Sequence, residues 1–166
     1  MGGEISPSAK PAASPKFALM AIQDVGTADA SPMPLQRMQI IKGWIDAEGG
    51  KREQVYDVAG DANNGATVDL ETCKTQGLGA QQLCTVWQDP NFDASLSAYY
   101  YARVLENPSC RWSQQMCVAN QVDCSKPSTI GKGFEGCCAK EHRPTIQERA
   151  WTSPIWYKPQ SALNDS

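Results

Sequence analysis

The chain has 166 residues, of which 41% are hydrophobic, and this is enough for one domain with a single modest core. Its formal net charge of −3 argues against binding to nucleic acid, because the basic residues are scattered and form no stripe that would displace phosphate counterions. No apolar run approaches the ~20 residues of a membrane-spanning helix, so we expect no membrane span. The apolar run at 17–22 is also shorter than the ~7–15 residues of a signal-peptide core, so no export signal is expected within the chain.

Composition divides the chain into a lead, a domain and a tail. Residues 1–16 are rich in Pro, Ala and Ser, which predicts a disordered lead or a linker. Residues 17–158 are expected to form one β-rich domain, and residues 159–166 to form a tail. Within the domain, residues 109–144 are predicted to be a cysteine-rich insertion, because so long a loop is uncommon unless cross-links hold it.

Several short β-rich runs lie between turn residues in the first half of the chain. The run at 17–22 is the first predicted strand. The runs at 38–45 and 53–58 flank the glycine-bearing turn at 46–50, and this arrangement predicts a β-hairpin. A further strand is possible at 66–73.

The second half continues the same pattern. The runs at 83–87 and 97–105 are expected to form the next pair, joined by the turn-forming segment Asp-Pro-Asn-Phe-Asp at 89–93. A short helix is expected after Arg111, and a last strand at 145–156. The sequence therefore predicts an all-β fold, namely an antiparallel β-sandwich-like domain with a long cysteine-rich loop.

Seven cysteines predict disulfides and an oxidising compartment. The odd count leaves one thiol that is either free or paired outside the chain. We expect Cys73–Cys84 to be a local bridge, and the adjacent Cys137 and Cys138 each to bond a distant partner. A zinc site is the weaker interpretation, because the spacing contains no Cys-x(2–4)-Cys knuckle and His142 is the single histidine; partly free thiols are a third. The disulfide candidates are Cys73, Cys84, Cys110, Cys117, Cys124, Cys137 and Cys138.

The runs at 98–112 and 147–157 combine aromatic residues with charged residues that a solvated strand would not need. The simpler interpretation is a central strand with its tyrosines in the core. The functional alternative is that Arg103 and Glu106 reach a surface shared with another domain, with Arg111 and Trp112 beside them.

The closing run raises a related question, because the neighbouring residues Glu148 and Arg149 face opposite sides of a strand. If one of them is buried it needs a partner, and we hypothesise the ion pairs Arg103–Glu148 and Glu106–Arg149. No catalytic residue is assigned, because the sequence contains no nucleophile elbow, phosphate-binding loop or histidine-rich metal motif. The candidate interface or site-lining residues are Arg103, Glu106, Arg111, Trp112, Glu148 and Arg149.

Five segments together resemble the C-terminal region of the bacterial domain of unknown function 3604 family. They are Leu-Gln-Arg-Met-Gln-Ile-Ile-Lys-Gly-Trp at 35–44, Val-Tyr-Asp-Val-Ala at 55–59, Trp-Gln-Asp-Pro-Asn-Phe-Asp at 87–93, and the runs at 99–112 and 145–157. Longer members begin with a PHP-like barrel, a class of metal-dependent phosphoesterases. The resemblance implies that this chain is a non-catalytic C-terminal accessory domain or fragment of a periplasmic or secreted PHP-like hydrolase.

The same resemblance implies the partner and the cofactor. The partner would be the PHP-like catalytic barrel, and a divalent metal is expected only in that barrel, since its His and Asp motifs have no counterpart here; no cofactor is assigned to this chain. Two alternatives remain open. The chain could be a free-standing secreted, disulfide-stabilised binding module, or a redox or metal protein that uses its cysteine cluster.

Overall fold

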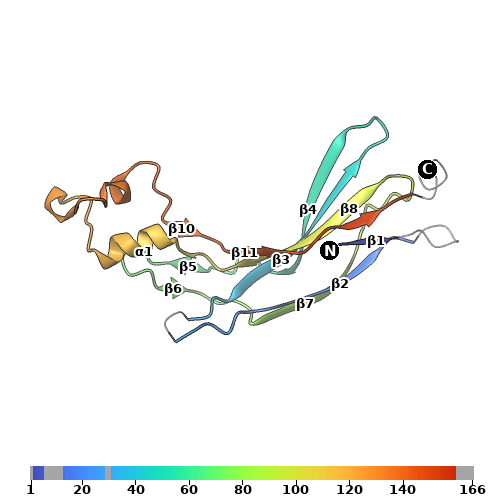
Figure 1. Cartoon of the computed structure of the whole chain (residues 1–166). Coiled ribbons are helices and arrows are strands. Elements are labelled where there is room, and N and C mark those ends of the chain that lie inside the picture. Colours follow the sequence, from blue (N-terminus) through green and yellow to red (C-terminus); the bar gives the residue numbers. More distant parts are fainter. Residues whose placement is uncertain (1, 6–12, 29–30, 160–166) are drawn as a thin grey trace.

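The computed structural model describes residues 2–5, 13–28 and 31–159, and Figure 1 shows strands at the centre and a helical arm at one end. The predicted all-β fold is confirmed. The strands are β1 (Gly3–Ile5), β2 (Lys16–Ile22), β3 (Leu35–Ile45), β4 (Lys51–Gly60), β5 (Thr67–Val68), β6 (Thr75–Gln76), β7 (Gln82–Gln88), β8 (Ala98–Glu106), β9 (Ser109–Cys110), β10 (Thr145–Ile146), β11 (Arg149–Trp151) and β12 (Ile155–Tyr157). The helical segments are α1 (Trp112–Ala119) and the 3₁₀ turns η1 (Pro127–Thr129) and η2 (Glu135–Cys138).

The main sheet has the strand order β1-β12-β8-β3-β4, with β11 also paired to β8. Its pairs are antiparallel except β1 with β12. The predicted hairpin is confirmed as β3–β4. At its turn the carboxylate of Asp46 accepts a hydrogen bond from the Gly50 amide at 2.5 Å, and Gly49 takes the left-handed φ of +81° that favours glycine.

A second layer consists of β2 and β7, which pair antiparallel along their whole length and which we call the β2–β7 ribbon. Its inward face carries Phe17, Leu19 and Leu83, which pack on the main sheet. Phe17 and Leu19 lie against the buried Ile40 and Tyr100, and Leu83 clusters with Leu35 and Met38. The expected pairing of 83–87 with 97–105 is therefore wrong. Strand β8 has β3 on one side and β11 and β12 on the other, so neither edge of β8 is free to pair with β7. Strand β7 instead packs its apolar face against one face of the main sheet.

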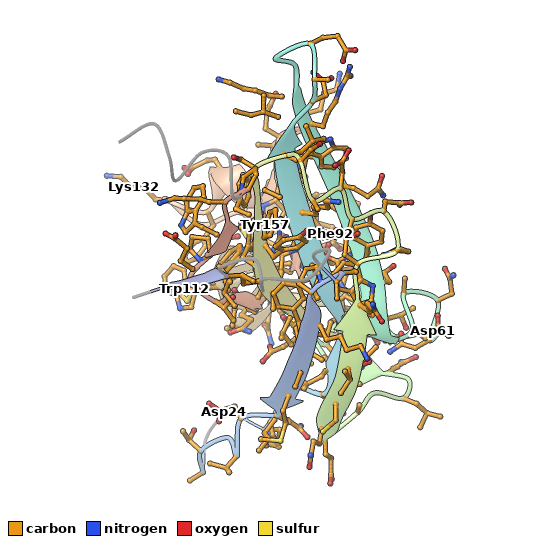
Figure 2. All side chains as sticks on the ribbon, turned by 90° about the vertical axis from the view of Figure 1, so that its right-hand side faces the viewer. Asp24, Asp61, Phe92, Trp112, Lys132 and Tyr157 are labelled. Atoms are coloured by element: carbon orange, nitrogen blue, oxygen red, sulfur yellow. A yellow bond between two sulfur atoms is a disulfide. The ribbon has the colours of Figure 1, made fainter. Side chains whose placement is uncertain are left out.

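The core confirms the interpretation of the aromatic run as a central strand. Tyr100 is 1% exposed and Tyr157 is 2% exposed. Tyr157 meets Phe92 edge to face, with ring centroids 4.9 Å apart, and the two residues are labelled side by side in Figure 2. Tyr99 and Tyr101 alternate to the other face of β8, where their rings stack with centroids 6.3 Å apart.

The cysteine-rich arm begins with α1, as expected, and disulfides hold it together. The bonds are Cys73–Cys110, Cys117–Cys137 and Cys124–Cys138. The adjacent cysteines near the end of the arm thus do bond distant partners. The expected Cys73–Cys84 bridge is wrong, because Cys84 lies on the outer face of the ribbon, where it is exposed and free.

Three further expectations change in detail. Within the lead, Gly3–Ile5 forms β1 rather than a disordered linker, while residues 6–12 lie outside the described residues, as does most of the predicted tail. The possible strand at 66–73 shrinks to β5. The last strand at 145–156 divides into β10, β11 and β12, with Pro154, which has no amide hydrogen to donate, just before β12.

Candidate functional site

An apolar cleft of about 510 Å³ opens between the end of β2 and strand β11. Its apolar walls include Met20, Ile22 and Trp151, which are 65%, 66% and 57% exposed. Met20 and Ile22 are exposed on the same face of β2 and line one cleft, whereas exposed apolar residues scattered singly are normal for a protein. We call this site the apolar cleft.

Carboxylates stand at the border of the apolar cleft. Glu106 and Glu148 line it together with Asp24 from the segment after β2. The backbone explains why the two glutamates meet, since the Glu106 amide donates to the Glu148 carbonyl at 3.0 Å. Burial raises the pKa of Glu106 above its ordinary value, and repulsion from Glu148 and then Asp24 raises it further.

The hypothesised ion pairs Arg103–Glu148 and Glu106–Arg149 do not form in the part of the chain that the structure describes. Arg103 instead donates from Nε and Nη2 to Gln39 Oε1 at 2.8 and 2.5 Å. The register of β11 is the reason, because it sets Arg149 opposite Leu105 and Trp151 opposite Arg103. Neither arginine is therefore a cross-strand neighbour of the glutamate that was its hypothesised partner.

A second, polar cleft of about 400 Å³ lies where the cysteine-rich arm joins the main sheet, and we call it the arginine groove. Three arginines line it from three elements: Arg37 from β3, Arg111 from the residue before α1, and Arg149 from β11. Gln36 and Gln147 also line it, and the Gln147 amide donates to Gln36 Oε1 at 2.9 Å. Sequence reasoning overlooked Arg37 and both glutamines.

Four of the six predicted site residues line these two clefts. Glu106, Glu148 and Arg149 line the apolar cleft, and Arg111 and Arg149 line the arginine groove. Arg149 thus belongs to both. Arg103 and Trp112 line neither, and Trp112, at the start of α1, is 74% exposed.

A family model for proteins of unknown function, DUF3604, matches residues 1–159. The chain belongs to the DUF3604 family. This match confirms the family resemblance seen in the sequence. No curated protein and no solved structure matches the chain.

Three general properties of this DUF3604 chain follow from the structure. Its three disulfides favour an oxidising compartment. No helix within the described ranges is long and apolar enough to cross a membrane. Within the same residues, no group of three or more His, Cys, Asp or Glu side chains is placed to hold a metal ion.

A third polar cluster of the DUF3604 chain lies in the core, around Asp89. Its carboxylate accepts hydrogen bonds from the Tyr100 hydroxyl at 2.7 Å and from the Asn91 amide at 2.9 Å, and it pairs with Lys42. Burial and hydrogen bonding to Asp89 strongly raise the pKa of Tyr100, so this phenol stays protonated. The adjoining cavity has a volume of about 20 Å³, room for one water molecule, so the cluster is structural rather than a ligand site.

Proposed function

We propose that this chain is a non-catalytic accessory domain that docks onto the PHP-like catalytic barrel of a metal-dependent hydrolase, in the periplasm or outside the cell. The outer face of the β2–β7 ribbon is the proposed contact surface. The observation that carries the proposal is that the middle of the outer face of this ribbon is apolar, as its inward face is.

A ribbon that packs on a core with one face ordinarily turns a polar face to water. In this ribbon the inward Phe17, Leu19 and Leu83 alternate with outward residues, and those in the middle of the outer face are also apolar. These apolar outward residues are Ala18, Met20, Ile22, Cys84 and Val86, whereas the polar Lys16, Gln82 and Gln88 stand outward at the ends of the ribbon. Cross-strand register places Ala18 opposite Val86 and Met20 opposite Cys84, so the outward residues form one patch. Strands that are apolar on both faces are typical of an internal layer, which supports a partner over this face.

The apolar cleft continues the same surface, because Met20 and Ile22 belong to both. The carboxylates of Asp24, Glu106 and Glu148 at its border favour a partner with an apolar centre and basic residues at one edge. The family resemblance supports a barrel as that partner, since longer members are expected to contain one.

The proposal is tested by mixing the oxidised chain with the barrel domain of a longer family member and measuring binding by isothermal titration calorimetry. We expect binding by the wild-type chain and at least tenfold weaker binding by Met20→Glu and by Val86→Glu. The reason is that each substitution would bury an unpaired charge in the interface.

Leu78→Glu is the matched control, because Leu78 is 83% exposed in a loop outside the ribbon. It should bind like the wild type. Circular dichroism and thiol counting establish that each variant is folded. If the barrel fails to bind, or if all three variants bind equally, the docking proposal is wrong. A chain that stays monomeric and unbound would favour the free-standing binding module.

A further inference from the structure

We propose that the arginine groove is a binding site for an oxyanion group, a phosphate or sulfate that is free or carried on a larger molecule. This site is separate from the outer face of the β2–β7 ribbon, although Arg149 also lines the apolar cleft. Its basis is that two guanidinium groups without an acidic partner are held on one segment of backbone and face a third arginine across a polar cleft.

Backbone carbonyls hold the first two arginines in place. Arg111 donates from Nε to the Thr145 carbonyl at 3.1 Å, and Arg149 donates from Nε to the Gln147 carbonyl at 3.4 Å. These carbonyls are two residues apart, a distance of about 7 Å in extended chain. Both guanidinium groups are therefore anchored through Nε along the same edge, which leaves their terminal amino groups to serve a ligand between them.

Charge in the groove is unbalanced. Among the described residues, neither Arg111 nor Arg149 forms an ion pair, and no carboxylate belongs to the described lining. Two acids are sequence neighbours of lining residues. Asp61, beside Ala62, accepts a hydrogen bond from the Asn63 amide at 2.8 Å within its own turn, and Glu148, between Gln147 and Arg149, lines the apolar cleft and not the groove. An unpaired pair of cations in one polar cleft favours a ligand that carries negative charge.

The third arginine and the glutamines form the remaining wall. Arg37 lies 3.4 Å from the carboxylate of Asp57 and also donates to Gln36 Oε1, so its charge is partly balanced. Gln36 Oε1 additionally accepts from Gln147, which uses the acceptor capacity of this oxygen. Gln147 also donates to the Glu106 carbonyl at 3.1 Å, so the donors available to an oxyanion are those of the arginines.

The chemistry of arginine narrows the ligand class. A guanidinium presents a planar fork of donors that matches the paired oxygens of phosphate, sulfate or carboxylate groups, whereas a lysine would act as a point charge. Two forks that line one cleft suit an anion with three or four oxygens better than a carboxylate with two. The volume of about 400 Å³ also leaves room for the group to which the anion is attached.

The test is isothermal titration calorimetry of the oxidised full chain with inorganic phosphate, sulfate and acetate in turn. Sodium chloride keeps the ionic strength constant. We expect phosphate or sulfate to bind with at least tenfold higher affinity than acetate. Arg111→Gln and Arg149→Gln should each weaken that binding at least tenfold. Arg149→Lys should fall between, because the charge remains while the fork is lost.

Arg52→Gln is the matched control, since Arg52 lies on β4 outside the groove and pairs with Asp46 at 2.7 Å. Its anion affinity should equal that of the wild type. An equal loss in Arg52→Gln would mean that general charge attracts the anion, and no binding of phosphate or sulfate to the wild type would mean that the groove is no oxyanion site; either result overturns the inference. Methyl phosphate distinguishes an ester from free phosphate. Met20→Glu should retain anion binding, so failure of docking leaves this test intact.

Discussion

The Lys42 ammonium lies 2.6 Å from the Asp89 carboxylate, and the two side chains are 5% and 0% exposed. Lys42 comes from the middle of β3, and Asp89 follows the last residue of β7, so the pair joins the main sheet to the β2–β7 ribbon. Lys42 also donates to the Asn91 carbonyl at 2.7 Å. An ion pair this deeply buried is strongly destabilising to break, because removing one member leaves a charge without its partner.

Replacing Asp89 with Asn is expected to lower the free energy of unfolding by about 3–5 kcal/mol. The amide keeps the shape of the side chain, but its single oxygen can replace only one of the two carboxylate oxygens that accept separately from the Asn91 amide and from the Tyr100 hydroxyl. The substitution also leaves Lys42 as a buried, unpaired cation. Urea denaturation of the oxidised protein measures the change. Lys126→Gln serves as the control, because it breaks the exposed pair with Asp123 and should cost about 0–1 kcal/mol. Equal small losses in both variants would contradict a structural role for the core pair.

Glu106 provides a prediction for pH dependence. Its pKa is raised in the folded chain by burial and by the nearby Glu148 and Asp24. Near neutral pH the carboxylate is ionised in the folded and in the unfolded chain. Burial and repulsion by Glu148 and Asp24 then destabilise the folded chain. As the pH falls through the raised folded pKa, the folded state takes up the proton first and its stability rises; this gain is complete below the ordinary value of 4.5.

Glu106→Gln should therefore raise the free energy of unfolding near pH 7, and its advantage over the wild type should fade as the pH approaches 4. Chemical denaturation at several pH values measures the difference. Glu53→Gln, at an exposed position of β4, is the control for the general effect of removing one negative charge. A Glu106→Gln advantage that grows toward low pH would contradict the prediction, because it would place the pKa shift in the opposite direction.

Gly43 and Tyr99 are cross-strand neighbours on β3 and β8, and the tyrosine ring covers the glycine. A methyl group at position 43 would meet the ring of Tyr99, which is confined by Tyr101 and Trp156 at centroid distances of 6.3 and 5.4 Å. Gly43→Ala is therefore expected to lower the free energy of unfolding by about 1–3 kcal/mol, measured by denaturation. Gly3→Ala, in a strand with open space around the added carbon, should be neutral or slightly stabilising. A neutral Gly43→Ala would contradict this packing.

Local sequence pattern was sufficient to identify most strands, but it could not assign their partners. The turn at 46–50 specifies the β3–β4 hairpin within a few residues, so it could be predicted. The pairing of β2 with β7 joins segments about sixty residues apart, and it depends on which sheet edges the other strands have already occupied. Proximity along the chain therefore favoured the wrong partner for β7, and with it the wrong partner for Cys73.

Individual residues of the candidate site could be predicted from the sequence, but their grouping in space could not. Arg149 and Glu106 stand out as charges within apolar strands, but whether they meet depends on the register of β11, and a shift of one residue moves every side chain to the other face. Lys42 carried a similar signal, since a lysine inside the run at 38–45 needs a buried acidic partner. The arginine groove had no such signal, because its third arginine comes from a strand far away in the sequence.

The disulfide pattern predicts one free thiol per chain in the denatured, unreduced protein, and none after Cys84→Ser. Cys84 is on the outer face of the ribbon, so it should also react with a thiol reagent in the folded protein unless a docked partner covers it.

The Cys73–Cys110 bond spans 37 positions of the sequence, and its removal by a double Cys→Ser substitution should lower the free energy of unfolding by about 2–4 kcal/mol. Peptide mapping under non-reducing conditions provides the direct check. A peptide that links Cys73 to Cys84 would contradict the register of the ribbon, because Cys84 could reach Cys73 only if β7 turned its outer face inward.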